Sequence, residues 1–136
     1  MVSPAQVTPV TAWTADHVRA LLPSVDASPW GPLEGPGDAL GGAFLFEFEQ
    51  GRAHALVAVR PVSLALGVRL DVVGLVSDGE RMRSGALDAA VCGIAQQLGA
   101  QQVAMCTKHE HVARQCARHG WQQTGVVMTK GLYVQQ

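Results

Sequence analysis

The chain has 136 residues, of which 48% are hydrophobic and 15% are charged, and its formal net charge is −1. This length predicts a single domain, residues 1–136, with a sizeable core, and the nearly neutral charge argues against nucleic acid or an anionic membrane as a partner. Soluble domains usually carry roughly 25% charged residues, so the low charged fraction indicates either a weakly charged surface or a surface partly buried against a partner. We expect the second, with a protein partner or a homo-oligomer.

The chain has an odd number of cysteines and no CxxC pair; they are Cys92, Cys106 and Cys116. This pattern predicts free thiols in a reducing compartment rather than a disulfide framework or a zinc module. The N-terminus lacks the basic and apolar regions of a secretory signal, and no apolar run approaches the ~18 residues of a membrane span. The expected location is therefore the cytoplasm.

The first elements are predicted from residues 5–11, which read as a strand. Thr14 can cap the helix that follows, and Pro23 is expected to end that helix. Residues 23–39 hold four of the seven prolines and are predicted to form a loop and not a helix. Trp30, in the middle of this loop, is expected to anchor in the core, with an exposed contact residue as the alternative.

The rest of the chain alternates between strand and helix patterns. Phe44, Phe46 and Phe48 alternate with other residues as in a strand, and a turn is predicted before the antiparallel strand that follows. Strands are predicted at 42–50, 53–60, 68–76, 101–107 and 124–132, helices ending at Gly99 and Gly120, and a charged loop at 77–84. The order β-α-loop-β-β-β-α-β-α-β predicts a mixed α/β (α+β) sheet.

The stretch KHEHVARQCARHGW, residues 108–121, predicts one amphipathic helix. Thr107 and Glu110 have the spacing of a capping box, and Glu110 and Arg114 form an i,i+4 pair in the favourable order. Gly120 is placed to end the helix in a left-handed turn. The apolar stripe along the helix predicts contact with the core on one side and with water or a partner on the other.

Residues 42–132 resemble the GNAT family of N-acetyltransferases. The resemblance rests on the strand meander, on the strand–loop–helix LDVVGLVSDGERMRSGALDAAVCGIAQQLGA, and on HVARQCARHGW. The last segment is similar to the family's N-x-x-A…Y-x-x-x-G-F ending, with Gly120-Trp121 in place of Gly-Phe. The resemblance implies a mostly antiparallel sheet flanked by helices and, where the chemistry is retained, acetyl-CoA as the cofactor.

The family's Gln/Arg-x-x-Gly-x-Gly/Ala loop brings backbone amides against the coenzyme A pyrophosphate at a helix N-terminus. Aligned by helix phase, the motif falls on Gly79, Met82 and Ser84. Other registers place Arg81 and Arg83 at the glycine positions, and none restores both glycines. The arginines could bind phosphate through their guanidinium groups, or they are solvated or contact a partner. The candidate cofactor-binding residues are Gly79, Arg81, Arg83, Ser84 and Gly85.

The family's acid–base residues are matched only in part. Asp71 lies about where the family has a glutamate that deprotonates the acceptor amine, so it is a candidate base, or a strand-edge carboxylate. Cys116 falls where the family has the tyrosine that protonates the departing thiolate. A thiol with a reference pKa of about 8.5 can donate a proton, but the apolar stripe favours a packing role. Gly74 is a candidate for a bulge near the acyl group, or for a strand kink.

Two walls of the family's acceptor site also differ. The hairpin that follows Gly120 in the family is abbreviated, and the loop at 23–39 replaces a helix. No metal is expected, because residues 109 and 111, both histidines, point apart on a helix. Cys116 and His119 are too few ligands for a closed zinc site.

Two functions stay open at this point. The missing glycines, the replacement at Cys116 and the low charge favour a non-catalytic protein with a degenerate acyl-CoA loop, which needs no cofactor and serves as a binding or assembly module. Divergent proteins of this kind are also encoded by bacteriophages, so a virion structural role is a narrower version. The alternative is an atypical acetyl-CoA-dependent N-acetyltransferase, with Asp71 as base and residues 81–85 around the phosphates.

Overall fold

The fold is a five-stranded sheet between two layers of helices, described here by a computed structural model that covers residues 4–30 and 33–132. The helices are α1 (Ala15–Asp26), α2 (Pro36–Leu40), α3 (Ser84–Gln97) and α4 (Glu110–Ala117). The strands are β1 (Gln6–Val10), β2 (Phe44–Gln50), β3 (Ala53–Leu64), β4 (Gly67–Gly79) and β5 (Gln102–Met105).

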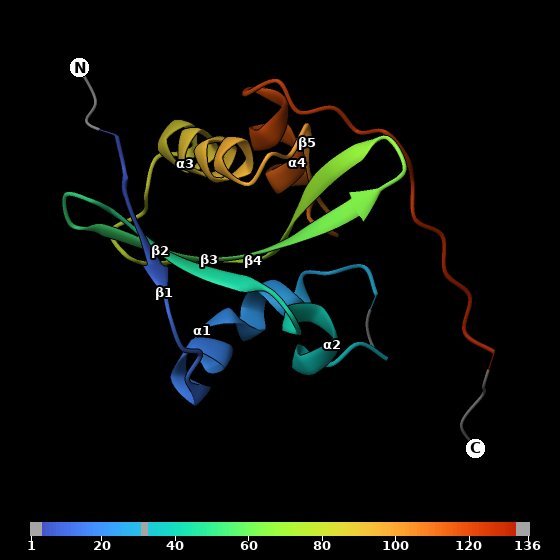
Figure 1. Ribbon diagram of the computed structural model, residues 1–136. Coiled ribbons are helices and arrows are strands. Elements are labelled where there is room, and N and C mark those ends of the chain that lie inside the picture. Colours follow the sequence, from blue (N-terminus) through green and yellow to red (C-terminus); the bar gives the residue numbers. More distant parts are fainter. Residues whose placement is uncertain (1–3, 31–32, 133–136) are drawn as a thin grey trace.

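The strands lie in the sheet in chain order, from β1 to β5. The pairs from β1 to β4 are antiparallel, and β4 and β5 are parallel. Figure 1 shows α3 and α4 over one face of the sheet and α1 and α2 over the other. The predicted mixed, mostly antiparallel sheet flanked by helices is therefore confirmed.

Both faces of the sheet are buried, each by different helices. On one face, Phe48 and Val57 are fully buried in a cluster that includes Val91 of α3. On the other face, Leu45 packs in a cluster with Leu21 of α1. Because both faces are covered, β3 reads as a nearly continuous apolar run from Ala55 to Val59, whereas β2 keeps polar residues at Glu47 and Glu49.

A bulge in β4 changes which face its later side chains occupy. The register shifts between Ala58 and Val59 of β3, which leaves Val73 of β4 as an extra residue. Because of this extra residue, Val72 and Leu75 both pack on the α3 face although they are three residues apart. The sequence-based hypothesis of a bulge at this point of the strand is confirmed.

Gly74, next to the bulge, is needed for close packing of the helices on the sheet. A Cβ atom at this position would lie 3.2 Å from a side-chain carbon of Leu21 and 3.2 Å from one of Leu40. These distances are shorter than ordinary van der Waals contact, so a side chain here would force the ends of the Leu21 and Leu40 side chains to shift.

The prediction that residues 23–39 contain no helix is wrong. α1 continues through Pro23 to Asp26, because Val25 in its last turn is buried against the sheet. α2 occupies the end of the segment, with Pro36 in its first turn, where the missing amide costs nothing. The amide of Gly35 donates to the Asp38 carboxylate at 3.0 Å and fixes the start of α2.

Trp30 is 47% exposed, so the expected core anchor is also wrong. It lies between α1 and α2, beside residues 31–32, which are outside the described part of the chain. Its ring therefore contributes to a surface rather than to the core.

α4 is shorter than the predicted helix and lacks the predicted capping box. It begins after His109, whose amide donates to the Thr107 hydroxyl at 3.1 Å, and no side chain caps its first amides. The predicted pair of Glu110 and Arg114 is present at 3.8 Å, and both side chains are exposed. Gly120 has a φ of +87°, which confirms the predicted left-handed turn.

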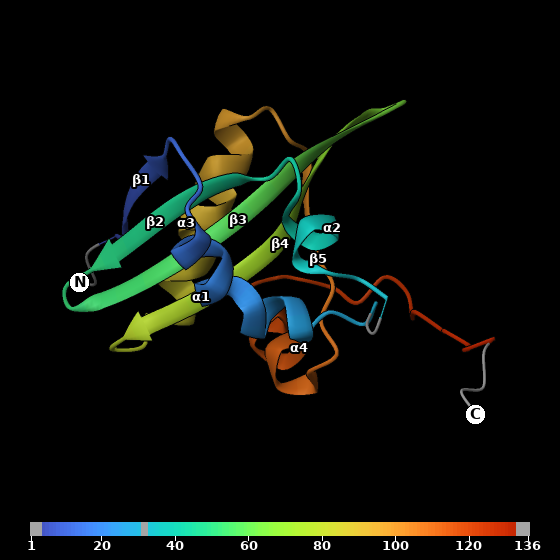
Figure 2. The same cartoon turned by 90° about the horizontal axis from the view of Figure 1, so that it is seen from below.

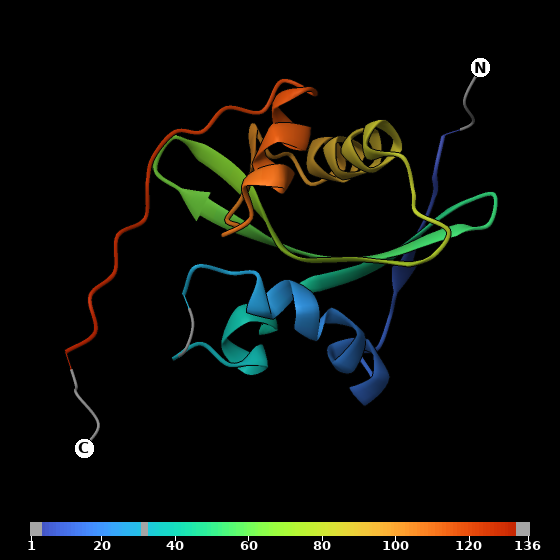
Figure 3. The ribbon, with the colours of Figure 1, turned by 180° about the vertical axis from the view of Figure 1, so that it is seen from behind.

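Two segments near the ends of predicted elements also differ from expectation. β4 runs to Gly79, so the predicted loop 77–84 is reduced to residues 80–83. The strand predicted at 124–132 is not formed. Among the described residues, no strand pairs with this segment. Residues 122–132, here named the C-terminal arm, run away from the body of the domain, as Figure 3 shows. In the described residues, no helix has the length and apolar character to cross a membrane.

Candidate functional site

β4 and β5 separate after a short parallel stretch, and a cavity opens where they part. Their pairing ends at Val72 and Met105, whereas β4 continues to Gly79. A cavity of about 380 Å³ lies there, lined by both strands, the end of α1 and the segment before α2. The amide of Lys108 donates to the carbonyl of Ala27 at 2.9 Å and closes one wall. Figure 2 shows α1 and α2 over this side of the sheet.

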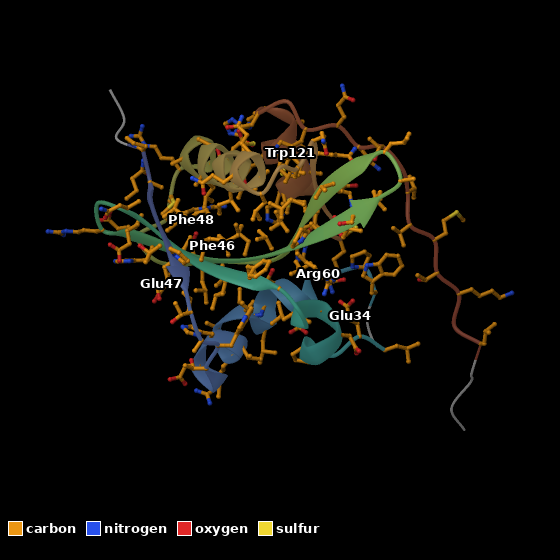
Figure 4. The ribbon with its side chains drawn as sticks, in the orientation of Figure 1. Glu34, Phe46, Glu47, Phe48, Arg60 and Trp121 are labelled. Carbon is orange, nitrogen blue, oxygen red and sulfur yellow. The ribbon has the colours of Figure 1, made fainter. Side chains whose placement is uncertain are left out.

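Asp71 lines the cavity, but its carboxylate is bound to an arginine. Arg69 donates from Nε to Oδ1 at 2.6 Å and from Nη2 to Oδ2 at 3.1 Å. The pKa of Arg69 is raised, mainly by this hydrogen bond and also by the charge of Asp71. Both oxygens of Asp71 are thus engaged, which limits their use as a base. Arg60 and Glu34 also line the cavity, and Figure 4 shows them at the end of the sheet near α2.

α1 occupies part of the β4 edge that β5 leaves open. The amide of Leu75 donates to the Ser24 hydroxyl at 2.9 Å. A linear acyl ligand lying between the strands would compete with Ser24 for this amide, because a backbone amide has a single proton to donate. The sequence prediction missed Ser24 because it placed the residue in a loop after Pro23.

The connection between β4 and α3 is fixed by a buried side chain. Met82 is only 3% exposed and belongs to the core cluster on the α3 face. Arg81 and Arg83 are exposed, and Arg83 precedes α3 in an extended conformation without a side-chain cap. Gly79, the remaining loop candidate, is the last residue of β4. Of the candidates in this connection, Arg81 and Arg83 therefore point to solvent on either side of the buried Met82.

The last turn after α4 lies against the start of α3. The Ser84 hydroxyl and Nε2 of His119 are 2.9 Å apart, within hydrogen-bond distance. A Cβ atom at Gly85 would lie 3.6 Å from Cε1 of His119. The imidazole thus stands beside the first residues of α3, where the resemblance places the cofactor phosphates. Within residues 4–30 and 33–132, no three histidine, cysteine, aspartate or glutamate side chains are grouped to hold a metal.

Cys116 lies behind Met105 rather than in the cavity lining. Its Sγ is 3.7 Å from Sδ of Met105, and Met105 lines the cavity. Burial raises the pKa of the Cys116 thiol, and the nearby carboxylate of Asp88 raises it further. Asp88 accepts a hydrogen bond of 2.7 Å from Nε1 of Trp121, which Figure 4 shows near α3 and α4. The sequence prediction did not identify Asp88, since nothing in the helix pattern distinguishes it.

Replacement of Asp88 by asparagine is expected to lower the pKa of Cys116, because the mutation removes a negative charge but keeps an acceptor for Trp121. Burial, the larger cause of the raised pKa, persists, so the pKa stays above its ordinary value. The pH dependence of Cys116 alkylation would measure the change in a protein whose other cysteines, Cys92 and Cys106, are replaced by serine. An exposed control, Asp78→Asn, should leave the profile unchanged, and an unchanged profile in Asp88→Asn would contradict the prediction.

The arrangement defines a class of α+β domains in which an antiparallel meander is followed by a parallel strand that separates from the sheet at a bulge. No protein-family model and no curated protein matches the sequence. Solved structures are similar along nearly the whole chain. An acetyltransferase from Trypanosoma brucei matches with a TM-score of 0.55 and 14% identity, over 94% of this chain and 99% of that one.

Two further structures have the same architecture. Glucosamine-6-phosphate N-acetyltransferase from Arabidopsis thaliana has a TM-score of 0.50 at 10% identity. The match covers 96% of this chain and 100% of that chain. A transcriptional regulator from Bacillus halodurans has a TM-score of 0.50 at 14% identity, with coverage of 93% and 100%. The chain has the GNAT fold. Because the identities are so low, the similarity defines the fold and leaves the function to the site.

Proposed function

We propose that this protein is a non-catalytic GNAT-fold domain that serves as a binding or assembly module. The observation that carries the proposal is the burial of Met82 in the connection between β4 and α3. A diphosphate held by backbone amides needs residues without side chains at close range. Here the connection is anchored to the core by one side chain, and its neighbours Arg81 and Arg83 have long side chains in place of glycine hydrogens.

Two further contacts support the same proposal. The Ser24 hydroxyl already accepts the Leu75 amide on the open edge of β4. His119 already stands at the Ser84 hydroxyl beside the first turn of α3. Each contact is internal to the chain at a place where the resemblance implies contact with acetyl-CoA.

Acetyl-CoA at millimolar concentration is expected to leave the melting temperature unchanged. A ligand present at about a hundred times its dissociation constant would stabilise the fold by about 2.7 kcal/mol, which a thermal-shift measurement detects easily. Coenzyme A carries the same diphosphate, so it is expected to leave the melting temperature unchanged as well. A saturable upward shift with acetyl-CoA would contradict the proposal.

An atypical acetyl-CoA-dependent N-acetyltransferase is the second candidate, and the start of α3 favours it. The first amides of α3 have no side-chain cap, and the exposed guanidinium groups of Arg81 and Arg83 lie just before them. Such an arrangement attracts phosphate. On this alternative, acetyl-CoA raises the melting temperature, Arg83→Ala removes the shift, and Asp71→Asn abolishes acetylation of an amine without removing the shift.

The assembly side of the proposal is supported by the exposed apolar surface. Large apolar side chains lie in solvent on three separate segments, as at Trp30, Leu66 and Met128. Met128 has the exposed Val126 and Leu132 close to it in sequence, so residues 122–132 carry the concentration of exposed apolar groups that a partner would cover. A cytoplasmic location and a place in a virion stay predictions.

A further inference from the structure

The C-terminal arm is an exposed segment with the pattern of a β-strand. Val126, Met128 and Leu132 are 78%, 89% and 85% exposed. Because side chains alternate along an extended chain, these three share one face, here named the apolar face, on which Lys130 also lies. Lys130 is the one charged residue of residues 122–132. An apolar, nearly uncharged segment with β-branched residues is suited to pairing with a strand rather than to exposure in water.

β5 offers the complementary feature, an open strand edge. The sheet ends at β5, and no strand in the described part of the chain pairs with its outer side. Residues 101–107 contain neither proline nor a charged residue, so the alternate amides that point away from β4 can donate to an added strand. The opposite edge of the sheet is less suitable, because Pro9 in β1 has no amide to donate.

We propose that the arm of one copy adds as a strand to the outer edge of β5 in a second copy, and that the exchange is reciprocal. This inference rests on the proposed assembly function and names its partner. A second copy is favoured because the arm runs away from the body of its own domain in Figures 1, 2 and 3. An extended segment of this length reaches about 35 Å, which is enough to cross to a neighbour.

The same geometry closes the assembly at two chains. Each copy has one arm to give and one β5 edge to receive it, so two equivalent contacts leave neither feature unpaired. Neither the arm, apart from Lys130, nor residues 101–107 carries a charge, so the contact buries few ionised groups. The low charged fraction of the whole chain agrees with a surface that is partly buried between copies.

The first experiment measures mass by light scattering during gel filtration of the full-length chain. The native protein is expected at twice the chain mass of 14.3 kDa. Val126→Asp with Met128→Asp is expected to halve the measured mass, because both aspartates fall on the apolar face of the arm. Gln123→Asp with Thr129→Asp adds the same charge on the opposite face and is expected to stay dimeric. A monomeric native protein, or a dimer that survives the first pair of changes, would overturn the proposal.

The second experiment identifies the strand that receives the arm. Cys106 is an exposed free thiol directly after β5, and serine replaces Cys92 and Cys116 to leave it as the single native thiol. Val126→Cys, Val127→Cys and Met128→Cys are then oxidised one at a time. At least one is expected to give a disulfide-linked dimer on a non-reducing gel. This linkage requires the arm and the end of β5 to lie close together, because a disulfide needs closely spaced backbones. The dimer is expected to disappear when Cys106→Ser is added, because the arm cysteine then has no partner thiol.

The outcomes separate this inference from the proposed function. A disulfide formed within one chain means that the arm pairs with its own β5, which overturns the exchange. A linked dimer that persists without Cys106 means that two arms meet each other, which also overturns it. A monomer that shows no thermal shift with acetyl-CoA removes the exchange but leaves an assembly role with another partner. A dimer that shows a saturable shift supports the exchange and contradicts the non-catalytic proposal.

Discussion

Replacing Phe48 by alanine is expected to lower the free energy of unfolding by about 3–5 kcal/mol, the range for removing a large buried aromatic side chain. Phe48 is 0% exposed and lies in the cluster between the sheet and α3, so the mutation leaves a cavity in the centre of that layer. Since the free energy of unfolding of a small domain is about 5–15 kcal/mol, this loss would remove a large part of it. Urea unfolding monitored by circular dichroism would measure the change.

β2 supplies a matched control for this mutation. Phe44 lies on the same strand and the same face as Phe48, but it is 54% exposed and does not belong to the cluster between the sheet and α3. Phe44→Ala is expected to change the stability far less than Phe48→Ala. Equal losses at the two positions would mean that burial does not decide the outcome, and the described core would then be incorrect.

Met82→Ala is expected to lower the free energy of unfolding by about 2–5 kcal/mol. The side chain is 3% exposed although the residue belongs to a four-residue connection between a strand and a helix. Its loss also releases the connection from the core, so the amides of Ala86 and Leu87, which donate to the Arg83 carbonyl at 3.1 Å each, should exchange faster with deuterium. Urea unfolding and hydrogen exchange would measure the two effects.

The neighbouring arginine provides the comparison. Arg83→Ala removes an exposed side chain and is expected to change stability by no more than about 0.5 kcal/mol. If Met82→Ala behaved like Arg83→Ala, the connection would not be anchored by Met82. Met82 would then no longer count against a backbone cradle for phosphate.

The strand meander could be predicted from the sequence because its signals are local. Alternation along β2 and a glycine turn at Gly51, whose φ is +59°, determine the hairpin without reference to the rest of the chain. Pro23 gave the wrong helix end for the opposite reason. The burial of Val25 by distant strands outweighs the local cost of proline in α1, and the sequence carries no local sign of that contact.

The candidate site shows the same difference between features set by local sequence and features set by contacts between distant segments. The position of Asp71 on β4 follows from the strand pattern, and the residue lines the cavity, but its role as a base stays a prediction. Its pairing with Arg69 and the contact of Ser24 with the Leu75 amide depend on side-chain geometry and on segments far apart in sequence. The arm failed as a strand prediction because propensity describes one segment, whereas a strand also needs an edge beside it.

The bulge at Val73 has a consequence for how β4 can change in length. Removing one residue from most positions of β4 would turn every later side chain to the wrong face of the sheet. Removing Val73 would not, because Val72 and Leu75 would then be two residues apart and would share the α3 face under ordinary alternation. β4 therefore has one site where a deletion preserves the hydrophobic pattern, and that site borders the gap between β4 and β5. A shortened strand there would run straighter, so the space between the two strands could be lost while the core stayed intact.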